Sequence, residues 1–360
     1  MKKFTKGCLM TALVLFLVGL ILSVVCGLLG GFRQLNEMNG IRGIPFWYGR
    51  NAIGGVELNL LGHEVEIPGY LDDIDDIDNY NISEGKAVLE KKLKELDGKK
   101  EQLSLTADTL GSIEIDVEGC NVLIQRSDDE YVWLLVEGDS HDYEPPHYAI
   151  ENDGVKSALC IENEVKHSIN HWKNGPNNAN LYLWLPDGCA LEECEINIGA
   201  GFMESIFIKA EHVNVSAGAA ALDLDGFEGK EILLSADAGE ILAGHVTAET
   251  AVLQIGAGHL RIEEISVSRK ADVNVSVGNC EIAGTITGDL DLECDMGYTE
   301  MYLTGSEDDH SYEVECGMGD VAVGSYSHGG FATERSWNEG MDSQFDIDCD
   351  MGNVVITFEE

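Results

Sequence analysis

The amino-acid sequence predicts an all-β fold, a parallel β-solenoid with coils of about 20 residues, preceded by one transmembrane helix and a short amphipathic helix. Three observations support this prediction: one long apolar run near the N-terminus, a short motif that recurs at a nearly constant spacing, and apolar residues that alternate on both sides of that motif. They divide the chain into a cytoplasmic tail and transmembrane anchor (1–32), a stalk or linker (33–102) and a β-solenoid repeat domain (103–360).

The N-terminal anchor is an apolar run from Cys8 to Phe32, which is 25 residues long. A helix of roughly 20 residues crosses a bilayer, whereas the apolar region of a cleaved secretory signal has only about 7 to 15. Lys2, Lys3 and Lys6 precede the run, and positive residues favour the cytoplasmic side. The sequence therefore predicts a single-pass protein of the cell membrane with a cytoplasmic N-terminus and an extracellular C-terminal domain.

The stalk contains an acidic run and one short helix. Five aspartates crowd between Leu71 and Tyr80, but they lack the Gly and Glu positions of an EF-hand calcium loop, so we interpret the run as a solvated linker. Between Lys86 and Asp97 the apolar residues keep a helical spacing, and Gly98 ends the pattern. This spacing predicts the short amphipathic helix.

A repeated motif defines the solenoid. The segment from Leu292 to Gly297 reads apolar, any, apolar, small or Asp, small or Met, Gly. The residue seven positions after each start is again apolar in nearly every unit, as at Leu260 and Ile282. A unit of about 20 residues cannot bury its apolar face alone, and a constant phase lets neighbouring units stack as parallel coils. The same pattern starts at Ile196, Val215, Leu234, Leu253, Val275, Val314 and Ile347, and in a weaker form at Ile115.

Two positions of the motif, compared across all units, indicate a turn rather than a metal site. The fourth position varies between Gly and Asp, which share a tolerance for turn backbone rather than a ligand oxygen. The third position holds core residues, Val277 among them, and the three cysteines Cys294, Cys316 and Cys349. We expect Cys294 and Cys316 on adjacent coils. The sequence leaves open whether they form a disulfide, and side chains stacked in register point in parallel, which fits the torsion of a disulfide badly.

The composition and motifs exclude several function classes. The chain carries 65 acidic and 22 basic residues, a formal net charge of -43 at pH 7, which repels nucleic-acid phosphates. Neither the GxSxG motif of serine hydrolases nor the phosphate-binding GxxxxGK[ST] motif occurs. His167 and His171 have the spacing of a metal pair, but loop residues follow them. We therefore expect no catalytic residue, cofactor or metal site, and a protein that is not an enzyme.

The repeat domain is similar to a known family. The strand from Leu181 to Leu185, the turn from Pro186 to Gly188 and the coils from Cys194 onward resemble the bacterial putative-adhesin family of β-strand-repeat domains of unknown function. The resemblance covers residues 103 to 360, behind a single helix. It implies a solenoid at the cell surface and no established catalytic residues.

Two classes of function remain. The first is a non-catalytic, membrane-anchored surface module for adhesion or envelope-stress sensing, with an envelope protein or a glycan as its partner. The alternative is a carbohydrate-active β-helix enzyme, similar to a polysaccharide lyase, that acts on cell-envelope or host glycans. Such an enzyme needs acids and a basic residue that converge on one outer face. The sequence predicts no particular oligomeric state.

The unit between Val314 and Ile347 is longer than the period, and its extra residues form the candidate partner surface. Long loops on a regular scaffold often carry binding sites, and Trp, Tyr and Arg are the residues that anchor interfaces. Alternatively, the aromatic residues of this segment fold back and cap the end of the solenoid, which must be covered to prevent edge pairing. The candidate residues are Tyr326, Phe331, Arg335 and Trp337, of which Phe331 and Trp337 would form the cap.

Overall fold

The computed structural model describes residues 58–60, 63–65, 99–137, 145–152, 154, 156–163, 179–329 and 333–359. The apolar run of residues 8–32 and the helix predicted at 86–97 lie outside this set. Within it, no helix has the length and apolar character needed to span a membrane. Strands β1 (Leu58–Leu60) and β2 (His63–Val65) pair with each other in antiparallel fashion. Apart from the single 3-10 turn η1 (Glu307–Asp309), the other described elements are strands as well, so the all-β prediction is confirmed.

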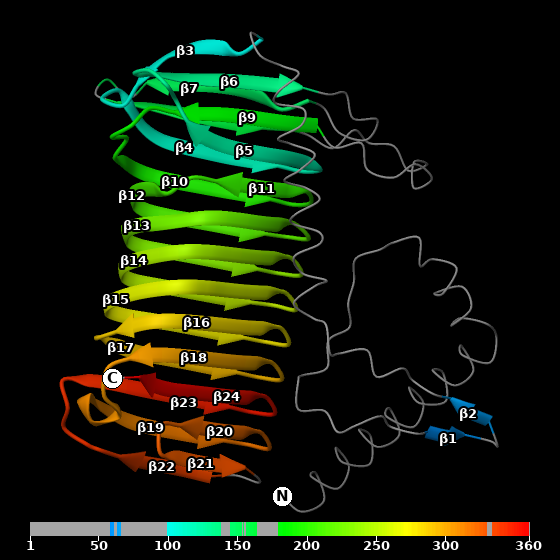
Figure 1. Cartoon of the computed structure of the whole chain (residues 1–360), viewed down its shortest axis with the longest axis vertical. Coiled ribbons are helices and arrows are strands. Elements are labelled where there is room, and N and C mark those ends of the chain that lie inside the picture. The colour runs from blue at the N-terminus through cyan, green and yellow to red at the C-terminus, as the bar shows by residue number, and fades with distance from the viewer. Residues whose placement is uncertain are drawn as a thin grey trace, which may run out of the picture. The chain divides into compact units, whose positions relative to one another are not determined.

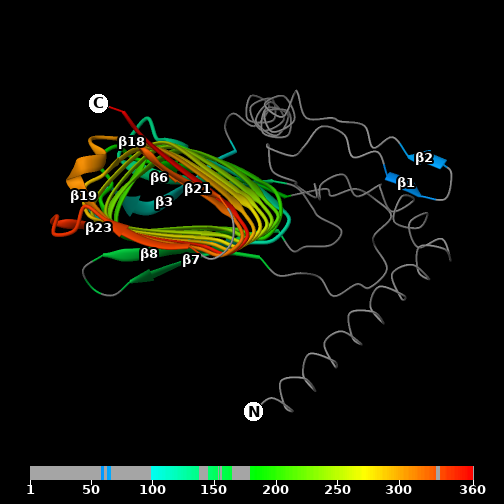
Figure 2. The ribbon, with the colours of Figure 1, turned by 90° about the horizontal axis from the view of Figure 1, so that it is seen from below.

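The central part of the repeat domain is a stack of parallel coils (Figure 1). Val215 pairs with Leu234, and Leu234 pairs with Leu253, so one coil contains 19 residues. Viewed along the stack, the coils superpose around a common interior (Figure 2). Parallel pairing at a constant spacing is the arrangement that a β-solenoid requires. The strands are β10 (Leu191–Ile198), β11 (Phe202–Ser205), β12 (Ile208–Ala217), β13 (Ala221–Ala236), β14 (Glu240–Ile255), β15 (His259–Val275), β16 (Asn279–Ile286), β17 (Asp289–Cys294) and β18 (Tyr298–Thr304).

Each of the coils built from β13, β14 and β15 has one tight corner and one bend. The corner lies between two strands, as at residues 237–239, where the motif places its small residues. On the opposite side the chain bends inside a strand, because β13 and β14 each continue for 16 residues. In these coils the strand that follows one corner therefore runs directly into the strand that precedes the next corner.

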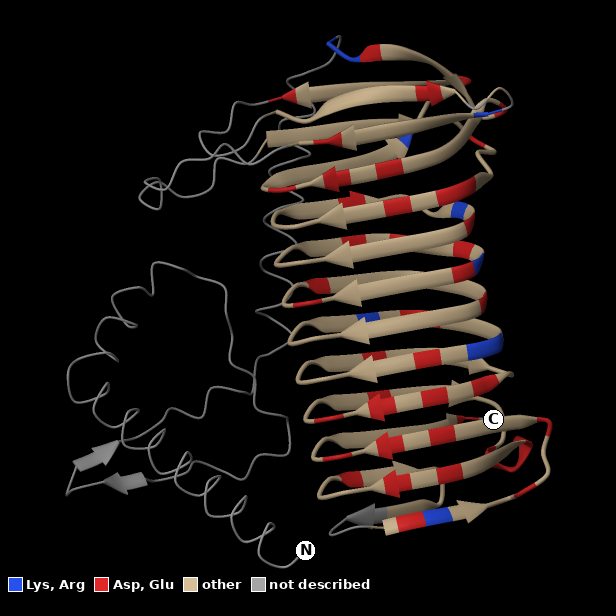
Figure 3. Ribbon diagram, turned by 180° about the vertical axis from the view of Figure 1, so that it is seen from behind, with Lys and Arg blue, Asp and Glu red and all other residues tan. Residues whose placement is uncertain are grey.

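Alternation of side chains separates the core from the acidic surface. In β17, Leu290 and Leu292 are buried, whereas Asp289, Asp291 and Glu293 face solvent. Figure 3 shows that Asp and Glu recur along the outer faces of successive coils and that Lys and Arg are sparse. Full burial of one such leucine contributes about 1.5 to 3 kcal/mol, and every coil adds several of them. The stack can therefore be acidic outside and continuously apolar inside.

One predicted repeat start is wrong by two residues. Leu253 pairs with Val273, and the register between β14 and β15 shifts just before that pair, where β15 contains one extra residue. The unit therefore starts at Val273 rather than Val275. As a consequence Val277 leaves the predicted core column and is 47% exposed, and Cys280 rather than Ile282 pairs with Leu260.

The last two coils are stacked in an order that differs from their order in the sequence. Strands β19 (His310–Cys316) and β20 (Asp320–Val323) come first in the chain, followed by β23 (Ser343–Cys349) and β24 (Asn353–Glu359). Yet β23 pairs in parallel with both β17 and β19, and β24 pairs in parallel with both β18 and β20. The final coil thus lies between two earlier ones. Cys349 separates Cys294 from Cys316, so the prediction that these two cysteines occupy adjacent coils is wrong.

At the N-terminal end of the stack, one coil likewise lies between two coils that both follow it in the sequence. Strand β4 (Leu110–Val117) lies between β10 and β8 (Ser157–Glu162), and β5 (Cys120–Arg126) lies between β11 and β9 (Ala179–Leu185). Antiparallel strands then cover the outermost parallel strands at each end. At this end they are β6 (Tyr131–Glu137) and β7 (His147–Asn152), with β3 (Glu101–Thr106) paired to β6, and at the other end β21 (Tyr326–Gly329) and β22 (Thr333–Trp337).

The bend between coils brings two backbones very close together. Gly226 has a positive φ of 134°, and a Cβ atom placed on it would lie 1.8 Å from the carbonyl oxygen of His245 on the next coil. Gly305 has the same φ of 134°, but a Cβ atom there would meet nothing within 4 Å. Substitutions at these two glycines therefore distinguish the effect of backbone strain alone from that of strain combined with a clash between coils.

We predict that Gly226→Ala lowers the melting temperature much more than Gly305→Ala. Both substitutions introduce backbone strain on the order of 1 to 3 kcal/mol, but only the first also pushes two hydrogen-bonded coils apart. Thermal unfolding followed by circular dichroism measures the difference. Equal losses for the two variants would contradict the close stacking at this bend.

Candidate functional site

The candidate partner surface lies at the C-terminal end of the stack, on the two antiparallel strands that cover it. Tyr326 is the first residue of β21, and Arg335 and Trp337 lie on β22. Strand β21 pairs with β20, and β22 pairs with β19. The structure thus brings together three of the four predicted residues, and Phe331 lies outside the described residues.

The rings of this surface form one continuous stack that begins in the core. Tyr312 of β19 is buried, and the ring of Trp337 lies on it, with centroids 4.6 Å apart and an angle of 10° between the planes. Tyr326 covers Trp337 at a centroid distance of 4.8 Å. The guanidinium carbon of Arg335 lies 4.8 Å from the centre of the Tyr326 ring and 6.0 Å from that of Trp337. The inner half of the stack anchors the covering strands, and its outer end presents an exposed cation over an aromatic ring.

A second group of buried aromatic residues supports the stack. The His310 ring lies over Phe345 with centroids 4.1 Å apart, and its Nδ1 is 2.8 Å from the hydroxyl oxygen of Ser343. The hydroxyl of Tyr312 donates a hydrogen bond of 3.0 Å to the carbonyl oxygen of Glu307. Sequence reasoning did not single out these residues. The repeat phase could have found two of them, because Tyr312 and Phe345 each lie two residues before a unit start and face one another in the register.

Three acidic side chains cluster on the strand pair formed by β19 and β22. Glu313 and Glu315 on β19 and Glu334 on β22 place carboxylate oxygens within 4.8 Å of one another, and all three are exposed. Exposed carboxylates are common without a bound ion, and the cluster needs none to be solvated. Glu334 pairs with Glu315, whereas Arg335 pairs with Val314. Because alternate residues of a strand point to opposite faces, the cluster and Arg335 lie on different faces of β22.

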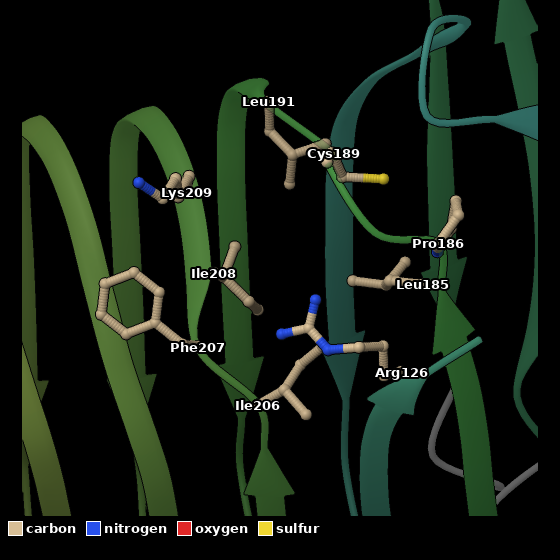
Figure 4. A pocket seen from close by; sticks show the side chains of 10 residues that line it. Arg126, Leu185, Pro186, Cys189, Leu191, Ile206, Phe207, Ile208 and Lys209 are labelled. Atoms are coloured by element: carbon tan, nitrogen blue, oxygen red, sulfur yellow. The ribbon is translucent and has the colours of Figure 1, made fainter. Parts of the chain in front are cut away.

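A small apolar pocket lies far from this surface, near the N-terminal coils (Figure 4). Its volume is about 130 Å³, and Leu185, Ile206 and Cys189 are among the residues that line it. Burial raises the pKa of the Cys189 thiol to about 11, so the thiol stays protonated at neutral pH and is a poor nucleophile. The two cations at the pocket, Arg126 and Lys209, form ion pairs with Asp187 and Glu228. Sequence analysis did not indicate this pocket.

Several basic residues of the central coils are engaged with acids on the neighbouring coil. Lys230 is one of them, and its hydrogen bond with Glu211 raises the pKa of its ammonium group. A lyase-like site needs a base that faces the substrate together with acids, whereas these cations bridge adjacent coils. The pairs are Lys209 with Glu228 at 2.5 Å, Lys230 with Glu211 at 2.7 Å and Lys270 with Asp291 at 3.5 Å.

Comparisons with known proteins identify one family and several similar solved structures. The family model Toastrack DUF4097 matches residues 110–357. Among solved structures, a "putative adhesin" from Bacteroides fragilis is similar at 10% identity, with a TM-score of 0.36, and the match covers 72% of this chain and 98% of that one. One from Parabacteroides distasonis has 14% identity, a TM-score of 0.40 and the same coverage. A "putative lipid binding protein" from Parabacteroides distasonis has 14% identity and a TM-score of 0.32, and the match covers 73% of this chain and 98% of that one. No curated protein matches the chain.

The packing of His310 predicts a pH dependence. Burial lowers the pKa of His310 below its usual value, and this effect exceeds the opposing effect of the Asp309 carboxylate. The unfolded chain therefore binds a proton at this position more readily than the folded chain. The contribution of His310 to stability is complete above the unfolded pKa of about 6.5 and is lost as the pH falls below it. We predict that the melting temperature of His310→Phe, which keeps a ring over Phe345, falls less than that of the wild type between about pH 7.5 and 5. Parallel curves for the two proteins would contradict this assignment.

Proposed function

The chain belongs to the Toastrack DUF4097 family, and from that premise we propose that it is a non-catalytic cell-surface module, built on a parallel β-solenoid and anchored in the membrane by one N-terminal helix. The apolar run of residues 8–32 with the preceding lysines supports the anchor and its orientation. Residues 33–102 would then connect the membrane to the repeat domain outside the cell. The acidic outer faces of the coils support solubility at a crowded surface.

The aromatic and arginine stack at the C-terminal end is the observation that carries the binding function. Tyr326, Trp337 and Arg335 come from strands that interrupt the regular coils, and Trp, Tyr and Arg dominate the energetics of interfaces. Their inner contacts with Tyr312 hold the rings in place before a partner arrives, which reduces the entropy lost on binding. We infer that this end of the solenoid binds an envelope protein or a glycan, in adhesion or in sensing of envelope stress.

The membrane topology is tested with tags at both ends of the chain. Protease added to intact, wall-stripped cells should cleave the stalk and release a C-terminal tag, while an N-terminal tag stays protected inside the cell. Lysed cells treated in the same way show that both tags can be cleaved. Full protection of the C-terminal tag in intact cells would contradict the proposed location.

The binding function is tested with Arg335→Ala against the matched control Arg261→Ala, which removes an exposed arginine from the middle of the stack. Retention on envelope glycans and capture of envelope proteins by the purified chain should fall for the first variant and stay unchanged for the second, with equal melting temperatures. Equal retention by both variants would contradict the proposed surface. Cleavage of a glycan by the wild type in the same panel would support the carbohydrate-active enzyme instead.

A further inference from the structure

Three corners of the C-terminal coils carry the same short motif. It reads Cys-Asp-Met-Gly at residues 294–297 and 349–352, and Cys-Gly-Met-Gly at residues 316–319. The three corners are consecutive in space, although they are not consecutive in the sequence, because the final coil lies between the other two. The changed order of the coils therefore brings three identical positions together.

Backbone hydrogen bonds align the methionines of these corners. The amide of Met351 donates to the carbonyl of Asp295 over 2.7 Å, and the amide of Met318 donates to the carbonyl of Asp350 over 2.6 Å. Met296, Met351 and Met318 thus form one line along the stack, which we call the methionine column. Adjacent strands in a sheet are about 4.8 Å apart, so neighbouring side chains of the column can contact the same ion.

The methionines are exposed and are not needed for packing. Their exposed fractions are 53% for Met296, 51% for Met351 and 58% for Met318. In the central coils the same corner position holds Ala238, Ala257 and Val277, which are also exposed. The corner therefore accepts Ala and Val, and the use of methionine at three consecutive corners calls for a reason outside the fold.

Thioether sulfur provides such a reason. It is a soft ligand that favours Cu(I), and the long flexible methionine side chain adapts to the geometry of the ion. A thioether also binds without releasing a proton, unlike a thiol. The surroundings favour a cation, because carboxylates of Asp350 and Asp295 adjoin the column. Burial, together with the negative charge of these two carboxylates, also raises the pKa of Asp348.

The cysteines of the same corners form a separate, inner column. Cys294 and Cys349 are completely buried and Cys316 is 3% exposed, and all three are free thiols. The next coil closes over them, since a Cβ atom on Gly352 would lie only 2.5 Å from the sulfur of Cys294. Thiols that are closed inside the core are poor first ligands for an ion that arrives from solvent.

We propose that Met296, Met351 and Met318 form a surface site for a soft monovalent metal ion, Cu(I), bound through thioether sulfurs of adjacent coils. The site is independent of the aromatic and arginine surface, and it requires only that the C-terminal coils are folded.

The test is a titration of the purified full-length chain with Cu(I), under anaerobic reducing conditions and in competition with a coloured Cu(I) chelator. The wild type should withdraw Cu(I) from the chelator. The combined variant M296L, M351L and M318L should bind at least about tenfold more weakly, and its melting temperature should be unchanged because Leu matches the volume of Met. Ag(I), which resembles Cu(I) and is inert to oxidation, should shift the methyl NMR signals of these three methionines.

Two control variants locate the ion. M341L replaces an exposed methionine that precedes β23, at the other end of that strand from the methionine column, and should leave the affinity unchanged. C294A combined with C349A removes inner thiols and introduces a residue that other coils carry at this position, and it should also keep the affinity. The proposal is overturned if the wild type does not compete for Cu(I), if the methionine variant binds as well as the wild type, or if binding is lost only in the cysteine variant.

Discussion

The parallel hydrogen bonding between successive coils is the constraint on which the rest of this structure depends. A strand in one coil can satisfy its two edges only through the coil before it and the coil after it, and one slipped residue would turn its apolar side chains outward. The 19-residue spacing from Val215 to Leu234 to Leu253 preserves this register. Where β15 contains an extra residue, that residue forms a bulge, and the buried residues continue in register with Val273 opposite Leu253.

The same constraint creates a problem at both ends of the stack, because the outermost parallel strands have an edge with no further coil. The chain solves it at each end by covering the outermost parallel strands with antiparallel ones. At the C-terminal end the covering strand β22 has the charged residues Glu334 and Arg335 in its short length, which discourages pairing with another molecule. Cap and candidate partner surface are therefore built from the same strand: Trp337 packs on Tyr312. Arg335, two residues earlier on the same face, lies over the Tyr326 ring and remains exposed.

The strong negative charge is compatible with this fold because alternation keeps it outside. Stacked coils place like charges near one another along each face, and that repulsion opposes stacking. Exposed cations partly offset it by bridging coils, as Lys209 does to Glu228 and Lys230 to Glu211. Because these cations pair with acids of the scaffold, they are less available to bind a partner. The candidate binding residues lie where the repeat departs from its usual sequence, at the aromatic end and at the methionine corners.

The sequence by itself determined the all-β fold class, the approximate coil length and, outside the unit near Val275, the alternation of buried and exposed residues, because these follow from local periodicity. The alternation around Leu292 and the recurring small corner are properties of a single unit, and every unit repeats them. The candidate surface was also partly predictable, since the unit that contains Tyr326, Arg335 and Trp337 exceeds the period. Tertiary structure alone decided the order of the coils. The units that start at Leu292, Val314 and Ile347 share one motif, so any two of them can be neighbours. The motif sets the register between neighbouring coils, but it does not set the order of the coils in the stack. The contact of Trp337 with Tyr312 and the line formed by Met296, Met351 and Met318 both depend on that order, and for this physical reason neither could be read from the sequence.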